Sequence, residues 1–252
     1  VTGSLGSDSA VDVAAGDTAE TIAATVNGVT GTTGVTATAV TKAALTLTNA
    51  GTVSFTLAGS ASQAISATLV SKDDLTALRD AINESTGTTG VSAVGTGATL
   101  TLTQADGKDI KLTDMASDGT DNNASVGSIR ALKADGSVDA QQVAIALSET
   151  TGATEDSATV AGTVTFASDT AFSVASNETG ANGTIMDQNS AGTATTSSTT
   201  LLSSVNISTE TGAQTAISTI DAAIQKVSTQ RAELGALQAR FDSIISNLTT
   251  GI

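Results

Sequence analysis

The residues TIAATVNGVTGTTGV, Thr21 to Val35, return 56 positions later as ALRDAINESTGTTGV, Ala77 to Val91. Both copies contain TGTTGV, and apolar residues hold equivalent places, as at Ile22 and Leu78. Further along, ALTLTNAG from residue 44 is answered by TLTLTQADG from residue 99, at nearly the same offset. We interpret these segments as two copies of one supersecondary unit, because self-similarity at a fixed period marks a repeated structural element.

Each copy is expected to contain a helix. Apolar residues spaced three to four apart predict about three helical turns. The N-terminal caps are expected at Asp17 or Thr18 in the first copy and at Ser71 in the second, because their side chains can accept a hydrogen bond from a free helical N–H group. Asn27-Gly28 and the TGTTG runs are predicted to end the helices and to act as connectors.

Strands are expected around each helix. AVDVAAG (residues 10–16) and AISATLV (residues 64–70) predict a strand before it. The period-two alternation after it is broken at residues 49–51 or 105–107, which predicts a β-hairpin with one apolar face. Each unit is therefore predicted to have the order β-α-β-β.

A third, degenerate copy is expected in residues 139–174, where AQQVAIALSETTG supplies a helix and GTVTF and FSV supply strands. The Gly-, Asn-, Ser- and Thr-rich residues 176–200 predict turns and a connector. The chain is accordingly divided into two repeat modules, a third module with the connector, and a segment with a long helix. These four parts are residues 1–70, 71–134, 135–200 and 201–252.

The last part predicts one amphipathic helix of about 60 Å, which begins near Thr209 or Thr211 and ends near Thr249 or Thr250. Its seam steps alternately by three and four residues, which is typical of a coiled-coil surface. The predicted self-association residues are Ile217, Ile220, Ile224, Val227, Arg231, Leu234, Gln238, Phe241, Ile245 and Leu248.

Two members of this seam are polar. Arg231 and Gln238 occupy positions where apolar residues would be more stable, and polar seam residues often fix register or partner. The alternative is that the long stem of Arg231 reaches out to solvent while Gln238 lies at an edge. In either case the seam requires partner helices, because the other predicted helices are too short to cover it.

The pattern R-x-x-L-G-A-x-Q-x-R-F-x-S-x-I-x-N-L, from Arg231 to Leu248, resembles the C-terminal coiled-coil segment of bacterial flagellin. The resemblance covers roughly residues 203–250. The two repeated units are similar to the inserts in the variable, outward-facing domains of flagellins. The resemblance implies an α+β fold, in which small β-α-β-β modules form outer domains and precede one long C-terminal helix of a coiled-coil core.

The resemblance also implies partners and a location. A whole flagellin has N-terminal helices before the outer domains and a final amphipathic segment after the long helix, and we expect both to be missing from this chain. The implied partners are those N-terminal helices of the same subunit, other flagellin subunits, and an innate immune receptor that would contact the helical core. The implied location is extracellular, in the bacterial flagellum.

The composition narrows the function classes. The formal net charge is -15, which argues against nucleic acid or an anionic membrane as a partner, because both require clustered cations. The absence of His and Cys excludes Ser-His catalysis and His- or thiolate-bound metals, so no catalytic residue, metal ligand or cofactor is predicted. The oxygen-rich residues 114–127 lack EF-hand spacing and are interpreted as a polar turn.

The sequence therefore predicts a structural protein, a flagellin subunit that self-assembles into a filament for motility. The alternative is a flagellin-like surface receptor or adhesin that binds polysaccharide in a groove of the repeated units. The lack of Trp and Tyr argues against this alternative, because sugars commonly stack on aromatic faces.

Overall fold

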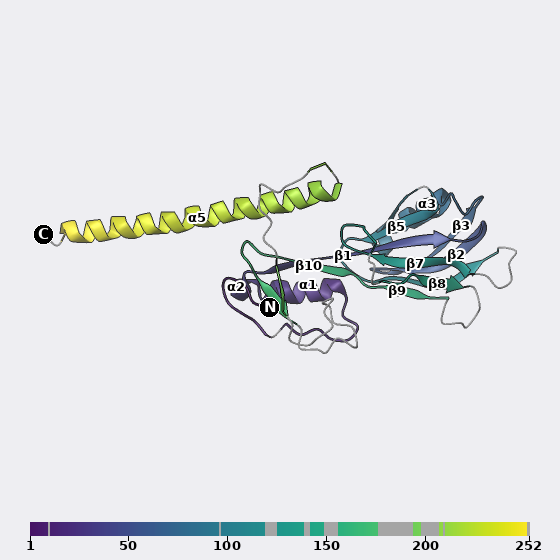
Figure 1. The fold of residues 1–252 in the computed structure, drawn as a ribbon, viewed down its shortest axis with the longest axis horizontal. Coiled ribbons are helices and arrows are strands. Elements are labelled where there is room, and N and C mark those ends of the chain that lie inside the picture. The colour runs from purple at the N-terminus through teal and green to yellow at the C-terminus, as the bar shows by residue number, and fades with distance from the viewer. Residues whose placement is uncertain are drawn as a thin grey trace. The chain divides into compact units, whose positions relative to one another are not determined.

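The structure is a computed structural model (Figure 1). It describes residues 1–9, 11–95, 97–118, 125–138, 142–148, 156–175, 194–197, 207–208 and 210–250. The chain forms two compact units. The sheet unit comprises residues 10–28 and 36–166, and the helix unit comprises residues 1–9, 29–35 and 167–252. Strands from both repeat copies thus belong to one unit, whereas the sequence-based division separates the copies at residue 70.

The sheet unit contains two sheets. The first has the order β4 (Val91–Val94), β5 (Thr99–Gln104), β1 (Thr36–Leu47), β7 (Ser125–Leu132) and β8 (Ile145–Ser148), and β10 (Thr163–Ala167) also pairs with β1. The second has the order β3 (Ser62–Leu69), β2 (Gly51–Ala58), β6 (Ile110–Ser117) and β9 (Ala158–Val160). The registered pairs within both sheets are antiparallel.

Two helices pack on these sheets. Helix α1 (Ala19–Gly28) lies against β1, and α3 (Thr76–Glu84) lies against β3 and β4. The Oγ1 atom of Thr18 accepts a 3.3 Å hydrogen bond from the N–H of Thr21, so the predicted cap of the first helix is confirmed. In the second copy the expected cap is wrong, because Asp74, not Ser71, accepts the bond from the N–H of Thr76.

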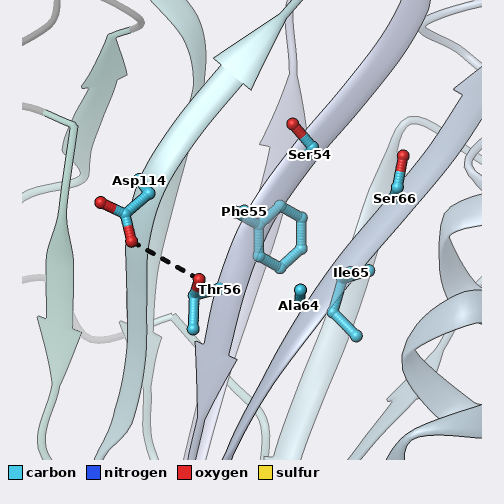
Figure 2. A pocket seen from close by; sticks show the side chains of 7 residues that line it. All are labelled: Ser54, Phe55, Thr56, Ala64, Ile65, Ser66 and Asp114. Carbon is cyan, nitrogen blue, oxygen red and sulfur yellow. Dashed lines mark hydrogen bonds between the residues drawn. The ribbon is translucent and has the colours of Figure 1, made fainter.

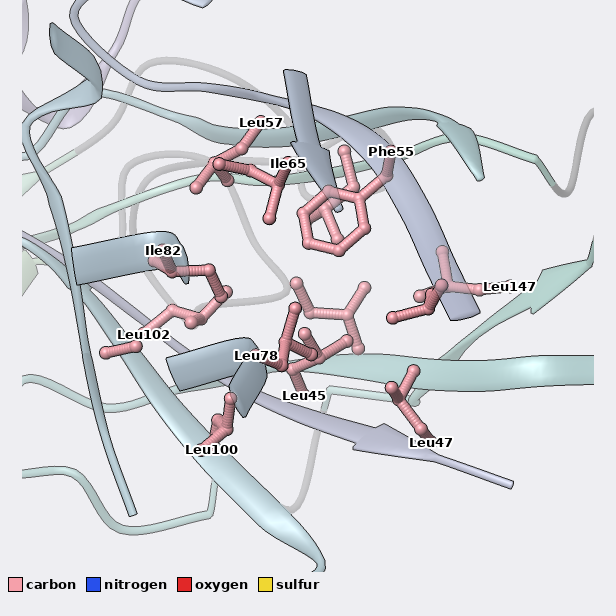
Figure 3. Close-up of a cluster of buried hydrophobic side chains, with 14 of the residues drawn as sticks. Leu45, Leu47, Phe55, Leu57, Ile65, Leu78, Ile82, Leu100, Leu102 and Leu147 are labelled. Carbon is pink, nitrogen blue, oxygen red and sulfur yellow. The ribbon is translucent and has the colours of Figure 1, made fainter. Parts of the chain in front are cut away.

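The hydrophobic core lies between the two sheets, and α3 adds to it (Figure 3). Strands β1 and β2 bury alternate residues, as the period-two pattern requires. Leu45 and Leu100 come from one sheet, Phe55 comes from the other, and Leu78 comes from α3. Phe55 is the aromatic member of this cluster, whose other side chains are aliphatic except for Met115. Many small contacts therefore stabilise the sheet unit.

The expected hairpins at residues 49–51 and 105–107 are not formed. At each of these turns the chain leaves the first sheet and enters the second, so β1 is followed by β2 and β5 by β6 without pairing between them. The sequence pattern did not reveal this difference, because alternation gives each strand one apolar face whether its partner is the next strand or a distant one. Each crossing lets both strands bury their apolar faces in the same core.

The second copy has its hairpin elsewhere. Strands β4 and β5 pair across residues 95–98, where Gly95 has φ 131°. In the first copy the corresponding residues are AVTK, from Ala39 to Lys42, and β1 continues through them as one strand of 12 residues. A backbone with positive φ favours Gly, so the first copy lacks the residue that the turn requires.

Two other expected elements differ. Residues 11–16 form no strand, whereas the equivalent β3 is held by its pairing with β2. In the predicted third copy, residues 145–148 form strand β8 instead of a helix, because pairing with β7 and burial of Leu147 outweigh local helical spacing. The rest of that predicted helix lies mostly outside the described residues, as does the connector at residues 176–200.

The helix unit contains α2 (Thr30–Thr33), the paired strands β11 (Ser173–Ala175) and β12 (Ala194–Thr196), and α5 (Glu210–Thr250). The short helix α4 (Thr86–Thr89) is the equivalent of α2 in the sheet unit. Helix α5 has 41 residues and its bounds agree with the predicted terminal helix. A fold of mixed helix and sheet that ends in a long helix is therefore confirmed.

Candidate self-association surface

All ten predicted self-association residues lie in α5. The side chains of nine are described, and all nine are exposed, while that of Leu248 is outside the description. Ile217 is 63% exposed, Leu234 62% and Phe241 58%. Large apolar side chains are seldom left open in a row, so the seam has the character of an unfilled interface.

A second face of α5 is partly covered within the helix unit. Ala216 is 4% exposed, and residues spaced from it by three or four positions are half-buried. The members of this face are Gly212, Ala216, Thr219, Ala223 and Lys226. Its residues lie next to those of the seam in sequence, which places the two faces about 100° apart around the helix axis.

Lys226 ties this covered face to its own unit. Its Nζ atom lies 3.4 Å from Oδ2 of Asp169, and both side chains are partly exposed. An ion pair at such a site contributes little stability by itself. Small residues thus allow one side of α5 to approach the rest of the unit, while the large apolar residues of the seam stay open.

The C-terminal half of α5 exposes more apolar surface than the predicted seam includes. Leu237 is 48% exposed and Ile244 is 50% exposed. A path through Leu234, Leu237, Phe241 and Ile244 also steps by three and four residues, and it avoids the polar Gln238. The signal for this path was present in the sequence, but the prediction followed one regular path and did not consider the second.

Arg231 and Gln238 are both exposed on α5. The isolated helix presents them beside the apolar residues, and each can still extend towards solvent. Their geometry is compatible with a role in register and with a position at the edge of an interface.

A shallow depression on the second sheet is the candidate for a polysaccharide groove (Figure 2). Its volume is about 250 Å³, and its lining residues are Ser54, Phe55, Thr56, Ala64, Ile65, Ser66 and Asp114. The ring of Phe55 is 3% exposed and belongs to the core, so it offers no face on which a sugar could stack. The Oγ1 atom of Thr56 donates a long, 3.5 Å hydrogen bond to Asp114.

Within the described part of the chain, no group of three or more acidic residues could hold a metal ion. The oxygen-rich residues 114–127 lie partly outside that description. Among the described helices, none has the length and apolar character needed to cross a membrane.

Two family models match the chain. The flagellin hook IN motif matches residues 1–51, which cover the first repeat copy. The bacterial flagellin C-terminal helical region matches residues 217–252, which begin at the first residue of the exposed seam. The sheet unit and the long helix therefore both contain flagellar sequence.

Named relatives agree with these models. The B-type flagellin of Pseudomonas aeruginosa is 32% identical over 238 residues, which make up 94% of this chain and 46% of the relative. Flagellin B of Vibrio cholerae is 54% identical over 44 residues, or 18% of this chain and 12% of the relative. The chain thus spans less than half the length of these relatives.

The matches at both ends define a flagellar class of protein. Together with the relative that matches almost throughout, they confirm the resemblance to bacterial flagellins. No match supports the polysaccharide-binding alternative.

Proposed function

We propose that the protein to which this chain belongs is a structural subunit of the bacterial flagellar filament, secreted and self-assembling for motility. The observation that carries this proposal is the row of exposed apolar side chains on α5, which coincides with the flagellin C-terminal helical region. The assigned role is structural rather than catalytic.

The proposed partners are helices that cover the seam. They belong to neighbouring subunits and to the N-terminal helical part of the same subunit, while the sheet unit is displayed on the outside of the filament as a variable domain. Arg231 and Gln238 set the register of these helices at some cost in stability. An innate immune receptor is a further proposed partner of the helical core.

Burial of apolar surface supplies the driving force. Fully burying a Leu or Phe side chain is worth about 1.5–3 kcal/mol, and Leu234 and Phe241 still have more than half of their surface to lose. Because the seam holds several such residues, one interface can gain enough free energy to balance the entropy lost on association.

The test is polymerisation of the full-length protein carrying Leu234→Asp or Phe241→Asp. A carboxylate at either position would have to be buried without a partner, so we expect sedimentable polymer to fall at least tenfold. Ser243→Asp is the matched control, because Ser243 lies about 200° around the helix from Phe241. Normal polymer from the Leu234 and Phe241 variants would overturn the proposal.

A further inference from the structure

The two repeat copies share their hydrogen bonds as well as their sequence. The side chain of Asn83 clamps the backbone of Ala93: its Nδ2 donates to the carbonyl at 2.9 Å, and its Oδ1 accepts from the N–H at 2.8 Å. Asn27 does the same to Ala37, at 2.8 Å for both bonds. Each Asn thus satisfies a strand residue as a neighbouring strand would.

The TGTTG turns are built alike. Thr86 donates to the carbonyl of Val91 at 2.9 Å, and Thr89 accepts from the N–H of Val91 at 3.2 Å. In the first copy the equivalent bonds, from Thr30 and to Thr33, measure 2.8 and 3.2 Å. Thr33 and Thr89 are fully buried, so these turns are more than connectors.

Each turn closes on a glycine that precedes it by about 30 residues. A Cβ atom on Gly59 would overlap the carbonyl oxygen of Thr89, and one on Gly3 would overlap that of Thr33. Both glycines are followed by Ser, and Gly3 and Gly59 are again 56 residues apart. The repeated unit therefore begins near residues 1 and 57, well before the helices that first reveal it.

We propose that residues 57–107 form a second hook IN motif, in tandem with the first. The family model matches residues 1–51, and the offset of 56 residues carries this range to 57–107. The shared determinants are Gly-Ser, the clamping Asn, the first and last Thr of TGTT, and the following Gly. Gly34 and Gly90 have φ of 74° and 70° and end the turns in the left-handed conformation.

This inference does not depend on the filament role. It states which residues hold each motif closed, and it assigns the same role to equivalent residues in both copies. It also explains why the predicted boundary at residue 70 divides the second motif: that boundary was placed at the helix, and the Gly-Ser turn with β3 lies before it.

The test uses three matched pairs of variants in the full chain: Gly3→Ala with Gly59→Ala, Asn27→Ala with Asn83→Ala, and Thr33→Val with Thr89→Val. Amide hydrogen exchange is followed at residues 35 and 37 in the first copy and at residues 91 and 93 in the second. We expect Asn83→Ala to speed exchange at Ala93 about tenfold and Asn27→Ala to do so at Ala37, because each removes one hydrogen bond from a buried N–H group.

Similar acceleration within every pair supports a second motif. The proposal is overturned if the second-copy variants leave residues 91 and 93 unchanged while the first-copy variants accelerate residues 35 and 37. Replacement of residues 77–93 by residues 21–37 provides an independent measurement, with the same insert shifted by one residue as the control. Equal loss of protection at residue 93 in the insert and in the shifted control also contradicts the proposal.

Discussion

Gly162→Ala is predicted to destabilise the sheet unit, because Gly162 lies in a space that admits no side chain. A Cβ atom there would lie 2.5 Å from Oγ1 of Thr41, 2.7 Å from Cβ of Ala19 and 2.9 Å from the carbonyl oxygen of Gly107. These three contacts come from β1, from the start of α1 and from the turn after β5. Relief of one contact by a backbone shift would tighten another.

The expected cost follows from these distances. Ordinary Cβ contacts lie at 3.4–4 Å, so each neighbour would have to move by several tenths of an ångström. Overpacking of this kind typically costs 1–3 kcal/mol, and we expect the upper half of that range because two of the neighbours are backbone or Cβ atoms. Urea unfolding followed by far-UV circular dichroism measures the loss, with an unchanged m value indicating the same denatured state.

A second variant makes the argument specific. Oγ1 of Thr41 is buried and has no hydrogen-bond partner among the described residues, so Thr41→Ala sacrifices no hydrogen bond. In the double variant the nearest contact is gone, and the combined loss should be smaller than the sum by about 1 kcal/mol. The reasoning is refuted if Gly162→Ala lies within about 0.5 kcal/mol of wild type, or if the two effects add.

Two further predictions concern the sheet unit. Leu45→Ala removes a fully buried side chain from between the sheets and should cost about 2–5 kcal/mol in urea unfolding, and a loss below about 1 kcal/mol would show that the core is not packed as described. Hydrogen bonds from the side chain and backbone of Thr76 lower the pKa of Asp74 from its ordinary 3.8, so Asp74 contributes stability above the unfolded-state pKa and loses it as pH falls through the lower folded-state pKa. Thr76→Val should raise that pKa towards 3.8 in an NMR titration, and no change would remove the side-chain hydrogen bond as its cause.

Local signals in the sequence predicted the features that depend on near neighbours. The offset between the repeats, the helix around Ile82 and the length of α5 all follow from spacing along one segment. The hairpins failed because strand pairing is nonlocal: nothing between residues 48 and 50 shows that β1 will pair with β5 and β7.

The internal bonds of the repeat show a second limit. Asn27 was interpreted as a helix stop, since Asn favours helix ends, but its side chain holds Ala37 ten residues away. The buried hydroxyl of Thr33 was likewise hidden in a run that has the composition of a loop. Polar residues with long-range partners have no local periodicity, so sequence patterns assign them to solvent.

The candidate surface lies between these cases. Its helix and most of its apolar residues were predicted, but Leu237 and Ile244 were omitted, because a single helix allows two regular paths over the same turns. Only the geometry of a bound partner can distinguish the two paths.

Cysteine labelling in the full-length protein tests burial of this face most directly. The chain described here contains no Cys, so Leu234→Cys and Ser243→Cys introduce single reactive sites on opposite sides of α5. Maleimide labelling of Leu234→Cys should be fast in the monomer and at least tenfold slower after assembly, with a smaller change for Ser243→Cys. Equal labelling of Leu234→Cys before and after assembly would contradict the role assigned to the seam.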